Sequence, residues 1–138
     1  MPTIHETLAY AAKNNLPILL FGGGVDGSRI NDEIERVVGK TPVVYRDWSM
    51  SEPTLEDVRQ AFREGMKDGR TLHVSVGDAF SSNLQDALLD VLSDGHLPGR
   101  DETAVPSGWL VVSTKVRLLS SLGLDPRELF SVCMGVER

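Results

Sequence analysis

PILLFGGGVDGSR, residues 17–29, joins a short apolar run to a glycine-rich loop. Residues 18–21 are all apolar, which is typical of a buried strand. Glycines end this run, and from about residue 28 to 38 apolar side chains recur with a helical period, at Ile30, Ile34, Val37 and Val38. A strand, a glycine loop and a helix in this order can hold an anion, because backbone N–H groups at a helix N-terminus point toward it.

The rest of the chain continues the alternation of strands and helices. Further helices are predicted over residues 4–14, 55–67 and 84–92, and further strands over 42–45, 71–76, 109–113 and 129–134. Residues 125–128 can also be interpreted as a helix start, and residues 48–53 as a loop. Short buried strands that alternate with helices predict a three-layer αβα sandwich with a mainly parallel sheet of about five strands. The length of 138 residues fits a single domain over residues 1–138.

Composition excludes several classes of function. A net charge of −6 lacks the attraction that non-specific nucleic-acid binding needs, and no basic cluster favours a membrane surface. No signal peptide is recognised, and a single cysteine, Cys133, fits a reducing compartment, so a cytoplasmic location is expected. We expect Cys133 to be a buried structural thiol and His73 to be packed within a strand. No His/Cys cluster has metal-binding spacing, so no metal site is predicted.

The glycine loop matches the phosphate-binding pattern G-x-x-x-x-G-K-[ST] only in part. Gly22 and Gly27 have the required spacing, but Ser28 replaces the lysine and Arg29 replaces the magnesium-binding hydroxyl. Asp26 adds a negative charge, and like charges 4 Å apart in a partly screened site repel by about 4 kcal/mol. Three interpretations stay open: a purely structural turn, altered anion binding, or nucleotide hydrolysis. The candidate anion-binding residues are Gly22, Gly23, Gly24, Gly27, Ser28 and Arg29.

The second half of the chain resembles the AAA+ ATPases of the MoxR-like group. The resemblance is carried by the segments Leu88–Leu97 and Val105–Lys115, and it extends over most of the chain from the first strand onward. It implies the fold of a P-loop NTPase. We expect no helical lid domain of the kind typical of the family, because the sequence leaves no room for one after the last core strand.

The resemblance also implies roles for single residues. Asp78 matches the magnesium-binding acid of the Walker B motif with Ala79 in place of the catalytic glutamate; alternatively, Gly77 replaces the acid. Lys115 stands where the family has a sensor asparagine. Arg127 lies near the position of the arginine finger, although a surface arginine in a first helical turn explains it as well.

These departures imply that hydrolysis has been lost, because phosphoryl transfer depends on charges at these positions. The leading hypothesis is a catalytically inactive AAA+-like domain with no catalytic residue and no cofactor, used for assembly, self-association or binding of protein partners. The first alternative is an ATPase or switch that binds ATP or ADP with magnesium through Arg29 and Asp78. The second is a small α/β domain whose resemblance is accidental. Trp48, in the predicted loop, is either an exposed contact anchor or a partly buried packing residue.

Overall fold

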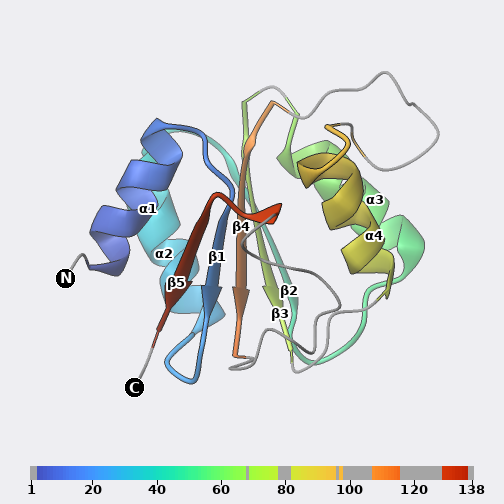
Figure 1. The fold of residues 1–138 in the computed structure, drawn as a ribbon, viewed down its shortest axis with the longest axis horizontal. Helices are drawn as coiled ribbons and strands as arrows, with labels where there is room; N and C mark the ends of the chain where they lie inside the picture. Colours follow the sequence, from blue (N-terminus) through green and yellow to red (C-terminus); the bar gives the residue numbers. More distant parts are fainter. Residues whose placement is uncertain are drawn as a thin grey trace.

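A computed structural model describes residues 3–67, 69–77, 82–95, 97, 107–115 and 129–136 of the chain. Helices and strands alternate along most of it, as Figure 1 shows. The helices are α1 (Ile4–Lys13), α2 (Gly27–Val38), α3 (Leu55–Gly65) and α4 (Ser82–Leu92). The strands are β1 (Ile18–Phe21), β2 (Val43–Trp48), β3 (Thr71–Val76), β4 (Trp109–Thr114) and β5 (Val132–Gly135).

The five strands form one sheet in the order β2-β3-β4-β1-β5, and every pair is parallel. Helices α1 and α2 cover one face of the sheet, and α3 and α4 cover the other (Figure 1). This confirms the predicted three-layer fold. Parallel strands place all their carboxyl ends at one edge of the sheet, which is where ligands bind in such folds.

Side chains of successive strand residues enter two separate apolar clusters. Leu19 packs in the cluster under α3 and α4, whereas Ile18 and Leu20 pack in the cluster under α1 and α2. All residues of β3 and β4 are buried, as expected for central strands of a sheet covered on both faces.

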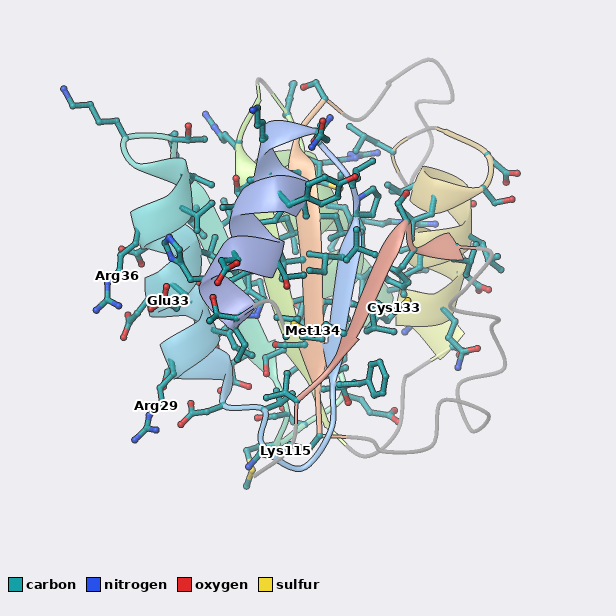
Figure 2. The ribbon with its side chains drawn as sticks, turned by 60° about the vertical axis from the view of Figure 1, so that its left-hand side comes forward. Arg29, Glu33, Arg36, Lys115, Cys133 and Met134 are labelled. Atoms are coloured by element: carbon teal, nitrogen blue, oxygen red, sulfur yellow. The ribbon has the colours of Figure 1, made fainter. Side chains whose placement is uncertain are left out.

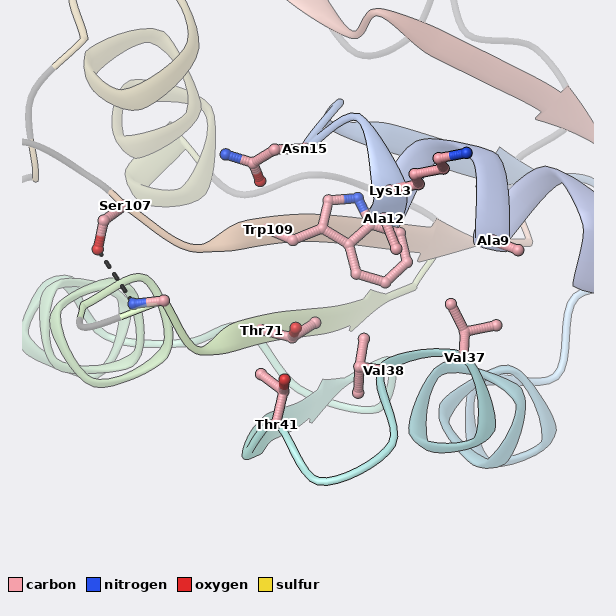
Figure 3. A pocket seen from close by; sticks show the side chains of 11 residues that line it. Ala9, Ala12, Lys13, Asn15, Val37, Val38, Thr41, Thr71, Ser107 and Trp109 are labelled. Atoms are coloured by element: carbon pink, nitrogen blue, oxygen red, sulfur yellow. Dashed lines mark hydrogen bonds between the residues drawn. The ribbon is translucent and has the colours of Figure 1, made fainter.

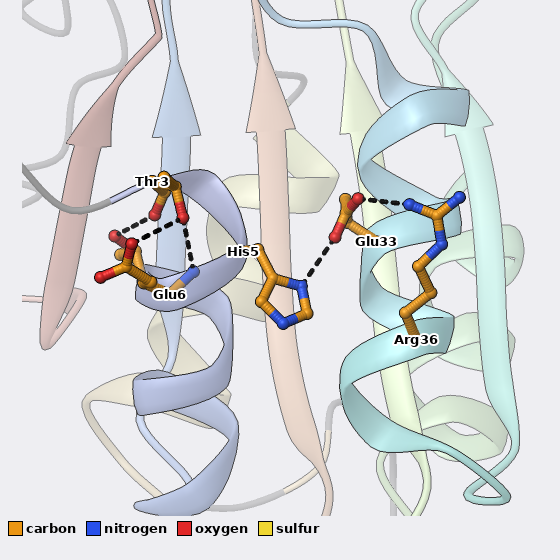
Figure 4. A network of polar contacts seen from close by, with 6 residues as sticks. Thr3, His5, Glu6, Glu33 and Arg36 are labelled. Atoms are coloured by element: carbon orange, nitrogen blue, oxygen red, sulfur yellow. Dashed lines mark hydrogen bonds and ion pairs between the residues drawn. The ribbon is translucent and has the colours of Figure 1, made fainter.

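Threonine side chains cap the starts of two helices. The Thr3 side chain accepts a hydrogen bond from the Glu6 amide at α1, and Thr54 forms a reciprocal capping box with Asp57 at α3. Between α1 and α2, Glu33 accepts a hydrogen bond from Arg36 and pairs with His5 Nδ1 at 2.8 Å (Figure 4). Glu33 therefore links α1 to α2 through His5.

Three predictions are corrected by the structure. Strand β2 continues through Trp48 because residues up to this point pair with β3, and Trp48 packs partly buried against the cluster under α3 and α4. Strand β5 begins at Val132 rather than at residue 129. Cys133 is exposed, because β5 is an edge strand whose residues alternate between half-buried and exposed (Figure 2).

Within the described residues, no helix is long and apolar enough to cross a membrane. The same residues contain no group of three or more His, Cys, Asp or Glu side chains that could hold a metal ion.

Candidate functional site

The glycine loop leaves the carboxyl end of β1, and its amides are bonded within the protein. The Gly22 amide donates to the Thr114 carbonyl at 3.1 Å, continuing the ladder between β1 and β4. The Gly24 amide donates to the Val136 carbonyl at 2.9 Å, and the Val25 amide to the Gly22 carbonyl at 3.2 Å. Gly22 has a φ of +125°, and a Cβ there would collide with the Val136 carbonyl, so the close approach requires glycine.

Asp26 caps helix α2 with its own carboxylate. Its Oδ1 accepts hydrogen bonds from the Ser28 amide at 3.2 Å, the Ser28 hydroxyl at 3.0 Å and the Arg29 amide at 3.4 Å. These bonds lower the pKa of Asp26 below its ordinary value. The bond from the Ser28 side chain has the largest effect, followed by that from the Arg29 backbone. The stabilisation by the charged cap is therefore complete above pH 3.8 and is lost as the pH falls through the lower folded-state pKa.

Arg29 does not fold back over the loop. Its side chain is 87% exposed and points into solvent, as Figure 2 shows, with Nε 3.6 Å from Asp26 Oδ2. The guanidinium forms an exposed ion pair with the Asp26 carboxylate. It therefore adds little to an anion site in the loop, since exposed ion pairs of this kind are weak.

Gly27, the first residue of α2, lies directly over polar side chains of β2 and β3. A Cβ at Gly27 would be 2.6 Å from both the Tyr45 hydroxyl and Ser75 Oγ. Burial first, and then the nearby Asp47 carboxylate, raise the pKa of the Tyr45 hydroxyl, so it stays protonated. The contacts beneath Gly27, the second glycine of the motif, therefore leave no room for a side chain at this position.

Below Tyr45, a buried polar chain joins α2 to the sheet. His73 is fully buried and stacks on the Tyr45 ring, with ring centroids 4.7 Å apart. Its Nδ1 lies 3.1 Å from Asn31 Oδ1, and its Nε2 lies 2.7 Å from Ser113 Oγ. The prediction that His73 is packed in a strand is confirmed.

The donor and acceptor of each hydrogen bond between Asn31, His73 and Ser113 can be assigned. Asn31 Nδ2 donates to the Glu35 carboxylate, which can only accept, so Asn31 Oδ1 faces His73 and needs a donor. His73 therefore carries its proton on Nδ1, and its Nε2 accepts from the Ser113 hydroxyl. Desolvation by burial lowers the pKa of His73 to about 3, so the imidazole is neutral at physiological pH.

A cavity of about 420 Å³ opens at the carboxyl ends of the strands, beside the glycine loop. Among the predicted residues, Gly27, Ser28 and Lys115 line it, together with the carboxylates of Asp26 and Asp47. Gly24 and Arg29 line a neighbouring groove toward α1. Asp78 and Arg127 lie outside the described residues. No pattern in the sequence points to Tyr45 as a lining residue, although polar residues at alternate positions of β3 could have suggested a polar floor.

A second cavity, of about 410 Å³, lies at the opposite end of the sheet. Figure 3 shows it between the C-terminal ends of α1 and α2, with Trp109 along one wall. The Trp109 indole donates to the Leu16 carbonyl at 2.8 Å, which fixes that wall. None of the residues predicted for the loop site lines this second cavity.

The amide donors at the start of α2, beside the first cavity, already have acceptors. The amides of Ser28 and Arg29, which would face a phosphate, already bind the Asp26 carboxylate. A phosphate placed there would meet that negative charge in a site whose lysine position holds Ser28. Among the described residues, Lys115 is the one cation that lines the cavity, together with the carboxylates of Asp26 and Asp47.

No protein-family model and no curated protein sequence matches the chain. Its structure is similar to that of RuvB from Thermotoga maritima, a Holliday junction branch migration motor, with a TM-score of 0.66 and 14% identity over 96% of this chain and 42% of RuvB. It is also similar to NtrX from Brucella abortus in complex with ADP, with a TM-score of 0.65 and 16% identity over 97% of this chain and 34% of NtrX. The chain therefore spans less than half of either protein.

At such low identity the likeness concerns the fold. Both neighbours are AAA+ P-loop ATPases, and both superpose over nearly all of this chain. The five-stranded parallel sheet, its helical layers and the glycine loop thus form an AAA+ ATPase-like fold of the P-loop class.

Proposed function

We propose that this chain is a catalytically inactive AAA+-like domain that acts by assembly or by binding protein partners. The observation that carries the proposal is the Asp26 carboxylate, which accepts the two α2 amides that a phosphate would need. An internal anion at a helix N-terminus satisfies the same donors and the same dipole as a bound phosphate. The amide donors at the start of α2 therefore have an acceptor without a nucleotide.

Other features support the same proposal. The Gly22, Gly24 and Val25 amides are used to hold the loop to its neighbours. Ser28 lacks the point charge of a lysine, and Lys115 replaces the sensor asparagine that the resemblance to the MoxR-like group implies. The first change removes charge stabilisation of a phosphoryl group, and the second replaces an amide that helps to position it, and phosphoryl transfer depends on both effects.

Isothermal titration with ADP and with ATP, each with magnesium, tests the proposal. We expect no saturable binding by the wild type at nucleotide concentrations up to about 1 mM. A triple variant, Asp26→Gly/Ser28→Lys/Arg29→Thr, restores the full loop pattern and removes the cap, so we expect it to gain affinity if the scaffold is otherwise intact. Asp32→Asn, an exposed charge change elsewhere on α2, is the matched control and should behave as the wild type.

Millimolar or tighter binding by the wild type, abolished by Arg29→Ala, would favour the nucleotide-binding alternative instead. The self-association part of the proposal has its own test, light scattering over a series of protein concentrations. We expect the average mass to rise with concentration. A constant monomer mass would remove self-association and leave binding of other proteins.

A further inference from the structure

A groove lies between α3 and α4, on the face of the sheet opposite the loop helix α2. Its volume is about 510 Å³, and α3 and α4 lie side by side along it (Figure 1). We call it the acidic groove and define it by the side chains that the argument uses, which are Leu55, Arg59, Asp86, Leu89, Asp90 and Asp94.

The acidic groove exposes apolar side chains on both of its helices. Leu55 of α3 is 43% exposed and Leu89 of α4 is 39% exposed, and they account for two of the four large hydrophobic side chains exposed in the described part of the chain. Val58 and Ala87, between them, are buried and form an apolar floor. Apolar surface of this kind with a polar rim is typical of an interaction site.

The rim of the groove is negatively charged. Asp86 and Asp90 lie one helical turn apart on α4, and Asp94 follows just past the end of that helix. All three line the groove and form its row of carboxylates. Among the described residues none of these carboxylates makes an ion pair. Of the residues that the structure describes, Arg59 is the one cation lining the groove.

The charge of α4 also runs against its own helix dipole. Helices α1, α2 and α3 each place a basic residue in the last turn, namely Lys13, Arg36 and Arg63. Helix α4 has none there, and carries Asp90 in that turn and Asp94 just beyond it. Carboxylates at the negative end of a helix dipole are unfavourable unless a cation meets them.

We propose that the acidic groove binds a basic amphipathic helix of a protein partner. Leucine-like side chains of the partner would pack between Leu55 and Leu89, and lysine or arginine side chains spaced by one helical turn would meet the row of carboxylates. The inference rests on the proposed partner-binding function and gives it a surface and a partner chemistry. It makes no use of the glycine loop.

The test uses a fluorescein-labelled synthetic helical peptide with leucine on one face and lysine on the other, measured by fluorescence anisotropy against the full chain. We expect saturable binding, and about fivefold or greater weakening in the Asp86→Asn/Asp90→Asn variant. Leu89→Ser should weaken it as well, because it removes apolar contact while leaving the charges. Neither Asp86 nor Asp90 is buried, so asparagine at these positions does not threaten the fold. Asp32→Asn on α2 is the control for loss of a surface charge elsewhere, expected to bind like the wild type.

A peptide with glutamate in place of lysine should not bind, and amide chemical shifts should move along α3 and α4. Equal affinity for the wild type and the double Asn variant, or shifts confined to other elements, would overturn the proposal. Nucleotide titration is a separate readout. If the protein bound nucleotide and also bound the peptide through the groove, only the inactive-domain function would be rejected. If it bound neither, only the proposed role of the groove would be rejected.

Discussion

At the scale of single residues, the polar side chains beneath α2 are all satisfied internally. Within the described residues no buried side-chain nitrogen or oxygen lacks a hydrogen-bond partner. The chain from Ser113 through His73 to Asn31 holds the first half of α2, whereas Ile34 packs the second half into the apolar cluster. Burying His73 without such partners would be costly, so the hydrogen bonds explain why a histidine is tolerated there.

The neutral state of His73 predicts a pH-dependent stability. Its pKa is about 3 when folded against an ordinary value of 6.5, so below pH 6.5 the unfolded chain takes up a proton that the folded chain refuses. The free energy of unfolding should therefore decrease as pH falls below 6.5, by up to about 1.4 kcal/mol per pH unit from this group. Urea unfolding at several values between pH 7.5 and 5 measures the slope.

His73→Gln is the control for that slope, since glutamine hydrogen-bonds but does not titrate in this range. Its stability should change less with pH than that of the wild type. Parallel pH profiles for the two proteins would show that another group is responsible.

At the scale of elements, periodicity predicts where helices and strands lie, and pairing decides where they end. Strand β3 matches the predicted range 71–76, and α2 begins one residue before its predicted start. Strand β2 runs three residues past its predicted end, because its length is set by hydrogen bonds to β3, which no local pattern encodes. The same reason explains Cys133, since its exposure depends on β5 being an edge strand.

The contact between α2 and the sheet at Gly27 gives a prediction for this scale. Gly27→Ala should destabilise the protein by about 1–3 kcal/mol, because the new methyl group would crowd the Tyr45 hydroxyl and Ser75 Oγ, each 2.6 Å away. Adding Tyr45→Phe and Ser75→Gly removes the crowding atoms. Urea unfolding should show that Gly27→Ala costs less in that background than in the wild type, and an equal cost in both would contradict the steric explanation.

At the scale of the whole molecule, the fold class was predictable and the chemistry of the loop was not. Alternating periods were enough for a parallel three-layer fold, and they placed the glycine loop at the carboxyl edge of the sheet. The sequence predicts that Asp26 repels a phosphate. That its carboxylate instead accepts the Ser28 and Arg29 amides depends on the backbone angles of the loop, which the phosphate-loop pattern does not specify.

Two clusters on one sheet predict a single cooperative unfolding transition. Leu19→Ala opens a cavity under α3 and α4, Leu20→Ala opens one under α1 and α2, and each should cost about 2–5 kcal/mol. The two tryptophans report on different faces, Trp48 on the first cluster and Trp109 on the second. Variants with one tryptophan replaced by phenylalanine leave one reporter each, and their fluorescence midpoints in urea should shift together with either cavity. A cavity that shifted the midpoint of only one of the two single-tryptophan variants would show that the faces unfold independently.

The strand order also has a consequence for synthesis on the ribosome. In the sheet, Ile18 of β1 pairs only with partners made much later, Val111 of β4 and Val132 of β5. At about 5–20 residues per second, the apolar strand β1 waits roughly 5–20 s for its first neighbour. During that time its backbone N–H and C=O groups have no ladder to join, and unpaired apolar strands are prone to aggregate. Nascent chains of this protein should therefore depend on chaperones that shield residues 18–21 until β4 has emerged.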